Sequence, residues 1–118
     1  MRIRGLQDRV EAWLEKVLPD QVTNAPLRAA RFLEEAAEAA QAVGLGEEDA
    51  LFVIGQVYAR PRGEIAQELG GCITTLCSLA TAVDIDLQRA SYDEMERVET
   101  PEIIEKVRKR QAEKINPK

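Results

Sequence analysis

Apolar residues recur at helical spacing along most of this chain, and proline and glycine interrupt the pattern at short intervals. Between residues 6 and 18 the spacing is i, i+3, i+4 and i+7, carried by Val10, Trp13, Leu14 and Val17. That spacing is typical of one face of an amphipathic α-helix. No segment alternates with period two over a length that would indicate a strand. The pattern therefore predicts an all-α fold.

Helix-capping and helix-breaking residues divide the pattern into six expected helices. Asn24 is expected to be the N-cap of the second helix, with Pro26 just inside it, and Thr100 with Pro101 is expected to start the last. The loop Arg60-Pro61-Arg62-Gly63 is indicated by its proline and glycine. We expect helices over 6–18, 25–43, 47–58, 64–83, 84–98 and 101–115, the last of them basic. At 118 residues the chain is expected to form one domain, 1–118.

Composition excludes several classes of function. The net charge of −5 argues against a nucleic-acid partner, which would require a basic face. The chain has no histidine, so Ser-His or Cys-His catalytic pairs and histidine-based zinc sites are excluded. Cys72 and Cys77 match no zinc spacing and are expected to be small buried residues. Without an apolar run of about 20 residues, no membrane contact is expected, and the cytoplasm is the expected location.

Two clusters of acidic residues lie on expected helices. The first is Glu34-Glu35-Ala36-Ala37-Glu38, and the second begins at Glu64 and includes Glu68. Carboxylates three or four residues apart share a helix face and repel one another by a few tenths of a kcal/mol per pair. A hard divalent cation between the two helices would offset this repulsion.

Helical projection places each acidic cluster on one side of its helix. With about 100° per residue, Glu34 and Glu38 share a stripe with Arg31, and Glu35 lies on its shoulder. Phe32, Leu33 and Val43 fall on the opposite side. In the later helix, Glu64 and Glu68 share a face with Gly71. Gly70 and Gly71 cost roughly 1 kcal/mol each relative to alanine inside a helix, which indicates close approach of another helix or of a ligand.

The order Glu34-Glu35-x-x-Glu38 followed by Glu68-x-x-Gly71 resembles the EExxE…ExxD signature of the MazG-type all-α nucleoside triphosphate pyrophosphohydrolases. The segment Gln67-Glu68-Leu69-Gly70-Gly71 is similar to the E-E-L-G-D turn of that family. The similarity covers roughly residues 27–83. It implies a MazG-like helical bundle completed by homo-oligomerisation, as a homodimer or a homotetramer. It also implies a Mg²⁺-dependent enzyme, with Mn²⁺ as a substitute, that converts a (d)NTP and water to (d)NMP and pyrophosphate in nucleotide pool control or house-cleaning.

Carried over residue by residue, the resemblance implies metal ligands at Glu34, Glu35, Glu38 and Glu68. The family aspartate is replaced by Gly71, which removes one ligand, and Glu64 is the candidate replacement. A divalent metal would lower the pKa of an attacking water, and Glu35 or Glu38 is the candidate catalytic base. Cationic side chains would hold the phosphates; the candidates are Arg60, Arg62, Lys106, Lys109 and Arg110. Trp13 and Tyr58 are candidates for stacking on the base.

Each of these residues also has a purely structural interpretation. The acidic residues could form a solvated helix face, Trp13 and Tyr58 could be helix-contact residues, and the basic cluster could stabilise a helix C-terminus. Arg60 and Arg62 could cap the preceding helix. Two functions stay open: an active pyrophosphohydrolase, and a catalytically weakened relative, damaged at Gly71, that binds nucleotide or only oligomerises. A helical interaction module is a weaker third.

Overall fold

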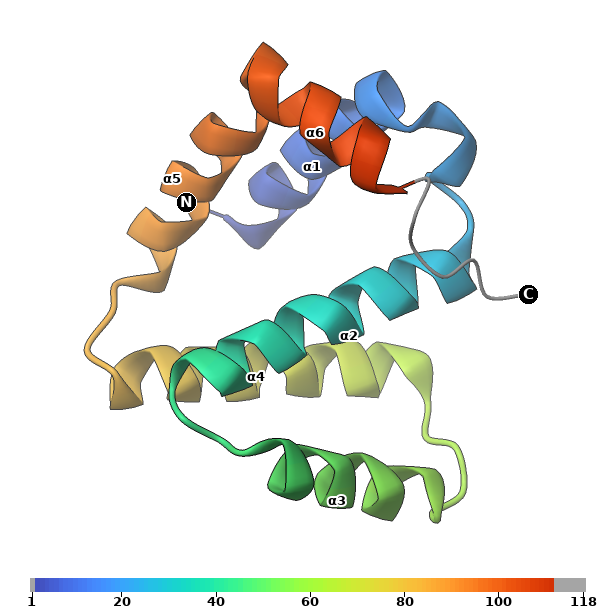
Figure 1. Cartoon of the computed structure of the whole chain (residues 1–118), viewed down its shortest axis with the longest axis vertical. Coiled ribbons are helices and arrows are strands. Elements are labelled where there is room, and N and C mark those ends of the chain that lie inside the picture. The colour runs from blue at the N-terminus through green and yellow to red at the C-terminus, as the bar shows by residue number, and fades with distance from the viewer. Residues whose placement is uncertain (1, 112–118) are drawn as a thin grey trace.

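The computed structural model describes residues 2–111, and within this range it contains α-helices and one 3₁₀ turn but no strand. Figure 1 shows the helices in chain order, and their bounds are α1 Ile3–Val17, η1 Pro19–Gln21, α2 Ala25–Ala42, α3 Glu47–Tyr58, α4 Ile65–Ala82, α5 Leu87–Val98 and α6 Pro101–Gln111. The all-α prediction is confirmed. The expected end of the last helix at Ile115 lies outside the described residues.

Helices α2 and α4 begin at residues whose side chains cap them. The Asn24 side chain accepts a hydrogen bond from the Leu27 amide at 3.2 Å, and the Glu64 carboxylate accepts one from the Gln67 amide at 3.0 Å. Both contacts satisfy one of the unpaired amides of a first helical turn. Pro101 occupies the first position of α6, as expected.

Two expected helix starts were wrong. The first helix was expected from residue 6, but α1 begins at Ile3. The fifth helix was expected from residue 84, but Asp84 lies in the turn before it, in the left-handed conformation with φ 56°, and Asp86 is the N-cap of α5. The amide of Ile85 donates to the Ala80 carbonyl at 2.9 Å, which closes the end of α4 in a Schellman motif. Aspartate tolerates this conformation better than most residues, but a sequence pattern gives little sign of it.

The helix pairs α2–α3 and α4–α5 repeat one local fold. Each pair joins an 18-residue helix to a 12-residue helix, and every bound of the second pair equals the corresponding bound of the first plus 40. The connecting turns also match, because Gly44 and Asp84 both have positive φ, and the amides of Leu45 and Ile85 both close a Schellman motif. The third helix of the chain, α3, is therefore the structural counterpart of α5.

The buried core joins α1, α5 and α6 to the start of α2 and the end of α4. It consists of Leu14, Val17, Leu27, Ala80, Met95 and Ile104. Polar contacts hold the same elements together. The Trp13 indole donates to the Val98 carbonyl at 2.8 Å, and Arg108 donates to the Val17 carbonyl at 3.1 Å. These two hydrogen bonds link α1 to α5 and α6.

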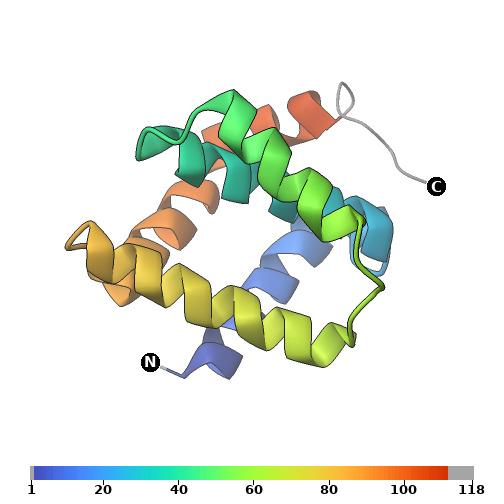
Figure 2. The same cartoon turned by 90° about the horizontal axis from the view of Figure 1, so that it is seen from below.

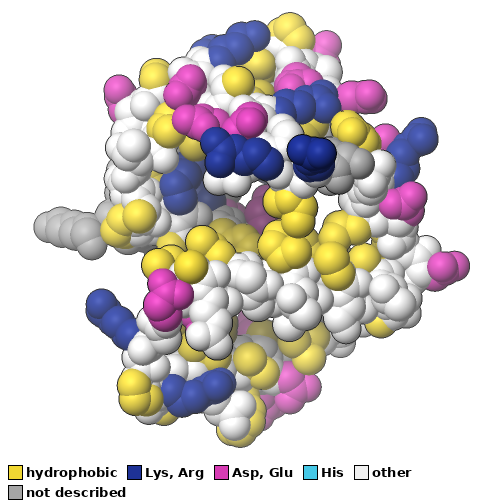
Figure 3. Space-filling model, turned by 180° about the vertical axis from the view of Figure 1, so that it is seen from behind, with side chains coloured by type: hydrophobic (Ala, Val, Ile, Leu, Met, Phe, Trp, Pro, Cys, Tyr) yellow, Lys and Arg dark blue, Asp and Glu magenta, His cyan; other side chains and the backbone are white. Residues whose placement is uncertain are grey.

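The other part, made of α3 and most of α4, is open. Figure 1 shows α3 at the lower edge of the molecule, and Figure 2, seen from below, shows α3 and α4 nearest the viewer. Large apolar side chains on these helices remain exposed, and Figure 3 shows apolar groups scattered over this face. The expectation that both cysteines are buried was wrong, because Cys72 is half-buried and Cys77 is exposed.

Among the described helices, none is by itself long and apolar enough to cross a membrane. Taken together, α4 and α5 reach the length and composition of such a span, but they are bent by 104° at the turn between them.

Candidate functional site

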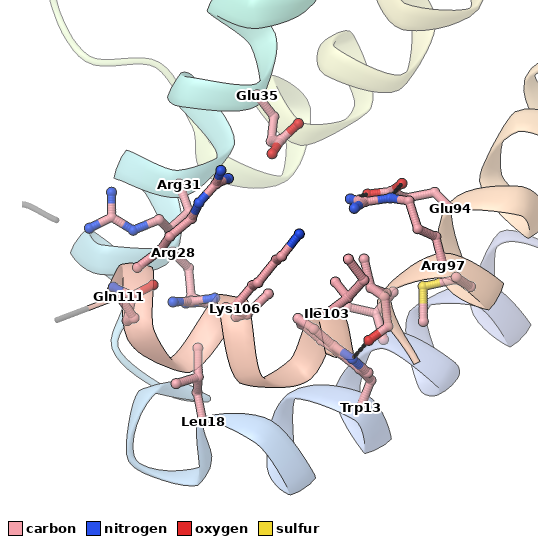
Figure 4. A pocket seen from close by; sticks show the side chains of 15 residues that line it. Trp13, Leu18, Arg28, Arg31, Glu35, Glu94, Arg97, Ile103, Lys106 and Gln111 are labelled. Carbon is pink, nitrogen blue, oxygen red and sulfur yellow. Dashed lines mark hydrogen bonds and ion pairs between the residues drawn. The ribbon is translucent and has the colours of Figure 1, made fainter. Parts of the chain in front are cut away.

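A cavity of about 520 Å³ lies between α2 on one side and α1, α5 and α6 on the other. This volume falls within the range of small-molecule sites. Figure 4 shows the side chains that surround it. The lining residues come from four helices and the turn after α1, and they are Val10, Trp13, Leu18, Arg28, Arg31, Glu35, Glu94, Met95, Arg97, Val98, Ile103, Lys106, Val107, Arg110 and Gln111.

The charge of this lining is opposite to that of the whole chain. Five cationic side chains, Arg28, Arg31, Arg97, Lys106 and Arg110, face two carboxylates, Glu35 and Glu94, which gives a formal charge of +3. The chain as a whole carries −5. A cleft lined with one sign of charge concentrates ligands of the other sign. The cavity is therefore suited to an anion with several negative charges.

Arg28 is the most constrained of these cations. One of its Nη atoms donates to the Gln21 side chain at 2.7 Å, and its Nε atom is buried without a hydrogen-bond partner among the described residues. Burial, and then repulsion from the Arg31 guanidinium, lower the pKa of Arg28 from its ordinary value. An anion bound here would relieve both effects and supply a partner for the buried Nε.

On the opposite wall, Arg97 is held by a carboxylate. Its Nε and Nη2 atoms donate to the two oxygens of Glu94 at 2.8 and 2.9 Å. This bidentate contact with Arg97 lowers the pKa of Glu94. Glu35 also acts on Arg97 electrostatically and helps to raise its pKa. Figure 4 shows the Lys106 ammonium between this pair and the two arginines of α2.

The other end of the cavity is apolar. Trp13, Met95 and Ile103 line it, and the hydrogen bond from the Trp13 indole to the Val98 carbonyl fixes the ring (Figure 4). Trp13 thus has a helix-contact role and also offers a flat apolar wall. A ligand that matched both ends would carry a polyanion at one end and a flat, less polar group at the other.

Three of the predicted metal ligands lie on α2, and the other two lie at the start of α4. Glu35 lines the cavity, and Glu34 forms an ion pair with Arg31 at 3.7 Å. Glu38 is exposed on α2. On α4, the Glu68 carboxylate lies against Gly63, where an added Cβ would collide with it. Glu64 caps its helix, and the Gln67 and then the Ala66 amides lower its pKa.

No group of three acidic or cysteine side chains within the part of the chain that the structure describes could hold a metal ion. The residues of a single chain therefore do not fit the magnesium site that the resemblance implies. Gly71 adds no ligand, and a Cβ placed on it would meet open space.

Of the predicted phosphate-binding cations, only Lys106 and Arg110 line the cavity. Lys109 is exposed on α6 and is not part of the lining. Arg60 and Arg62 are exposed near the end of α3, and Arg60 donates to the Gln56 carbonyl at 3.3 Å, which is the capping role considered above. Tyr58 is 80% exposed on α3 and is absent from the lining.

Sequence reasoning missed Arg28 and underestimated Arg31 as cavity residues. A signal was present, because residues 28, 31 and 35 fall at i, i+3 and i+7 and so share one face of α2. Which face of α2 turns toward α6 depends on tertiary packing, which the sequence pattern does not give.

Comparison with known proteins identifies no relative of this chain. No protein-family model matches the chain, and no significant match is found among curated proteins or solved structures.

Proposed function

We propose that this chain binds a nucleoside triphosphate in the basic cavity between α2 and α6. The observation that carries the proposal is the charge of the lining, +3 in a chain of net charge −5. A triphosphate carries several negative charges and would be drawn into such a cleft. Arginine guanidinium groups bind phosphate oxygens in charge-assisted pairs that are stronger than neutral hydrogen bonds.

The apolar end of the cavity supports a nucleotide over free pyrophosphate or phosphate. A flat base beside the fixed Trp13 ring would gain stacking of about 1–3 kcal/mol. The cavity volume of about 520 Å³ is large enough for a ligand of this size class. The triphosphate would then lie near Arg28, Arg31 and Lys106.

A second candidate function is hydrolysis of the bound nucleotide to the monophosphate and pyrophosphate, with Mg²⁺ or Mn²⁺. Two observations favour it: the order of the acidic motifs, which resembles the MazG-type enzymes, and the position of Glu35 in the same cavity as the cations. Two observations stand against it: no group of three acidic side chains among the described residues could hold a metal ion, and Gly71 supplies no ligand. The described carboxylates of one chain do not form a site that fits a metal ion.

We also propose that the chain works as a homo-oligomer, a dimer or a tetramer. The chain exposes 9601 Å² of surface, whereas a compact monomer of 13.1 kDa exposes about 6,400 Å². The radius of gyration of 15.3 Å likewise exceeds the roughly 13.5 Å expected for a compact chain of this length.

Calorimetric titration with a panel of NTPs and dNTPs, in EDTA and then in Mg²⁺, tests the binding proposal. Product analysis of the same mixtures separates the two candidates. Binding with release of pyrophosphate supports the hydrolase, and binding without turnover supports the nucleotide binder. Release of orthophosphate would refute the assigned bond cleavage. Absence of binding by every nucleotide would refute both functions.

A further inference from the structure

We propose that the open faces of α3 and α4 are the surface on which a second copy of this chain docks. This inference rests on the proposed homo-oligomer and assigns its contact surface. It does not depend on the nucleotide site.

Helices α3 and α4 have the composition of buried helices. No charged residue occurs from Ala50 to Ala59 or from Leu69 to Val83. A helix that is apolar on all sides normally lies inside a protein or an assembly. In the single chain, however, Leu51, Phe52 and Tyr58 on α3 are 60%, 66% and 80% exposed. Ile65 and Leu69 on α4 are 69% and 57% exposed.

The internal repeat identifies the uncovered side of α3. Its counterpart α5 buries Met95, half-buries Ser91 and Val98, and contacts α6. The residues of α3 that correspond to Ser91, Met95 and Val98, after subtraction of 40, are Leu51, Gly55 and Tyr58. That side of α3 is exposed within one chain.

Glycines occupy the middle of both helices, although no neighbouring atom of the same chain requires a residue without a side chain there. A Cβ added to Gly55 or Gly70 would meet no atom within 4 Å. Glycine weakens a helix, so its presence on an open face indicates that another backbone approaches there. Gly70, Thr74, Cys77 and Thr81 form one stripe along α4. The Thr74 and Thr81 hydroxyls donate to the carbonyls four residues earlier, so their polar atoms can be buried without a partner from outside.

The exposed area favours a second copy as the occupant, and the charge distribution indicates where it would dock. The surface of the whole chain exceeds that of a compact monomer of its mass by about 3,200 Å², and a standard interface covers roughly 800 Å² per partner. Two copies of a chain with net charge −5 repel each other over most of their surfaces. The uncharged stretches of α3 and α4 are where this repulsion is least. A two-fold pair would also cover the same faces in both copies at once.

Sedimentation velocity of the full chain and of two matched variants tests the proposal. Leu51 and Ile3 are equally exposed in the single chain, at 60% and 61%, but only Leu51 lies on the proposed surface. Wild type and Ile3→Glu should sediment at twice the chain mass of 13.1 kDa or at a multiple of it. Leu51→Glu should weaken self-association at least about 30-fold, as for the loss of an interface hot spot.

A wild-type chain that sediments as a monomer at micromolar concentration would refute the homo-oligomer. Binding of lipid vesicles or of another protein to these faces would not restore the proposal. An oligomer that survives Leu51→Glu as well as it survives Ile3→Glu would refute the assigned surface alone. Alkylation of Cys77 in wild type is a second measurement that does not depend on how a variant folds. The thiol should react slowly in the assembly, and reaction at the rate of an exposed thiol would overturn the docking on α4.

Discussion

Replacement of Arg28 by methionine should separate ligand binding from fold stability. Without ligand, the variant loses a hydrogen bond from the charged guanidinium to the Gln21 side chain, worth about 1.5–3 kcal/mol. It also loses the burial and the repulsion from Arg31 that lower the pKa of Arg28. Because these effects oppose each other, we expect the free energy of unfolding to change by less than about 1 kcal/mol.

The ligand-bound state should respond more strongly. A charge-assisted hydrogen bond in a partly open cavity contributes about 1.5 kcal/mol, so Arg28→Met should raise the Kd for a triphosphate about 12-fold. At a ligand concentration of about 100 times the wild-type Kd, the wild type gains about 2.7 kcal/mol and its Tm rises by about 10 °C. The variant should gain about 1.3 kcal/mol, or roughly 5 °C.

Thermal unfolding with and without pyrophosphate or a nucleoside triphosphate measures both quantities. Arg89→Met is the matched control, because Arg89 pairs with Asp93 on the exposed side of α5 and its loss changes the net charge equally. It should keep the full shift. Equal shifts in wild type and in both variants would contradict the assigned role of Arg28, as would a loss of more than about 2 kcal/mol in the ligand-free protein.

Three further changes have definite signs. Glu94→Gln should tighten nucleotide binding several-fold in calorimetry, because it removes a negative charge from the cavity and releases Arg97. The control Asp93→Asn, on the exposed side of α5, should have little effect on binding. Weaker nucleotide binding by Glu94→Gln would contradict this expectation. The Arg9 guanidinium lowers the pKa of Glu99, so this pair stabilises the fold above the ordinary pKa of glutamate and the stabilisation is lost as the pH falls through the lowered value. Glu99→Gln should therefore flatten the loss of stability in urea unfolding between roughly pH 5 and pH 3, and an unchanged profile would refute the linkage. Gly71→Asp should fold at least as stably as wild type, because a Cβ at this position meets open space. The MazG resemblance predicts that Mg²⁺ raises the Tm of this variant more than the Tm of wild type. Equal Tm shifts in the two proteins would count against a metal site at position 71.

Local chemistry made most helix boundaries predictable from the sequence. Asn24, Pro101 and Gly44 act within a few residues of themselves, and the structure places them as expected. The turn at Asp84 escaped prediction because an aspartate in the left-handed conformation leaves no strong pattern. The equivalent turn at Gly44 was visible because glycine is the usual residue there.

The cavity was only partly predictable, for a different reason. Lys106 and Arg110 were expected to bind phosphate as part of a basic cluster. Arg28 shares a helix face only with Arg31 and Glu35 and becomes a cavity residue through the packing of α2 opposite α6. The acidic motif at Glu34, Glu35 and Glu38 was recognised in the sequence, but the structure does not show the metal site expected from it among the residues it describes. Glu34, Glu35 and Glu38 share one region of α2, yet the conformation of a single chain does not bring Glu68 to them in a group that could hold a metal ion.

The fluorescence of Trp13 tests the central claim most directly, because it is the chain's one tryptophan and it lines the cavity. A nucleoside triphosphate titrated into the protein in EDTA should produce a saturable change in this fluorescence. Pyrophosphate should bind more weakly, the unphosphorylated nucleoside should have no effect, and added salt should weaken binding of the triphosphate. Fluorescence that is unchanged by the triphosphate, or that responds equally to the nucleoside, would contradict a basic nucleotide-binding cavity.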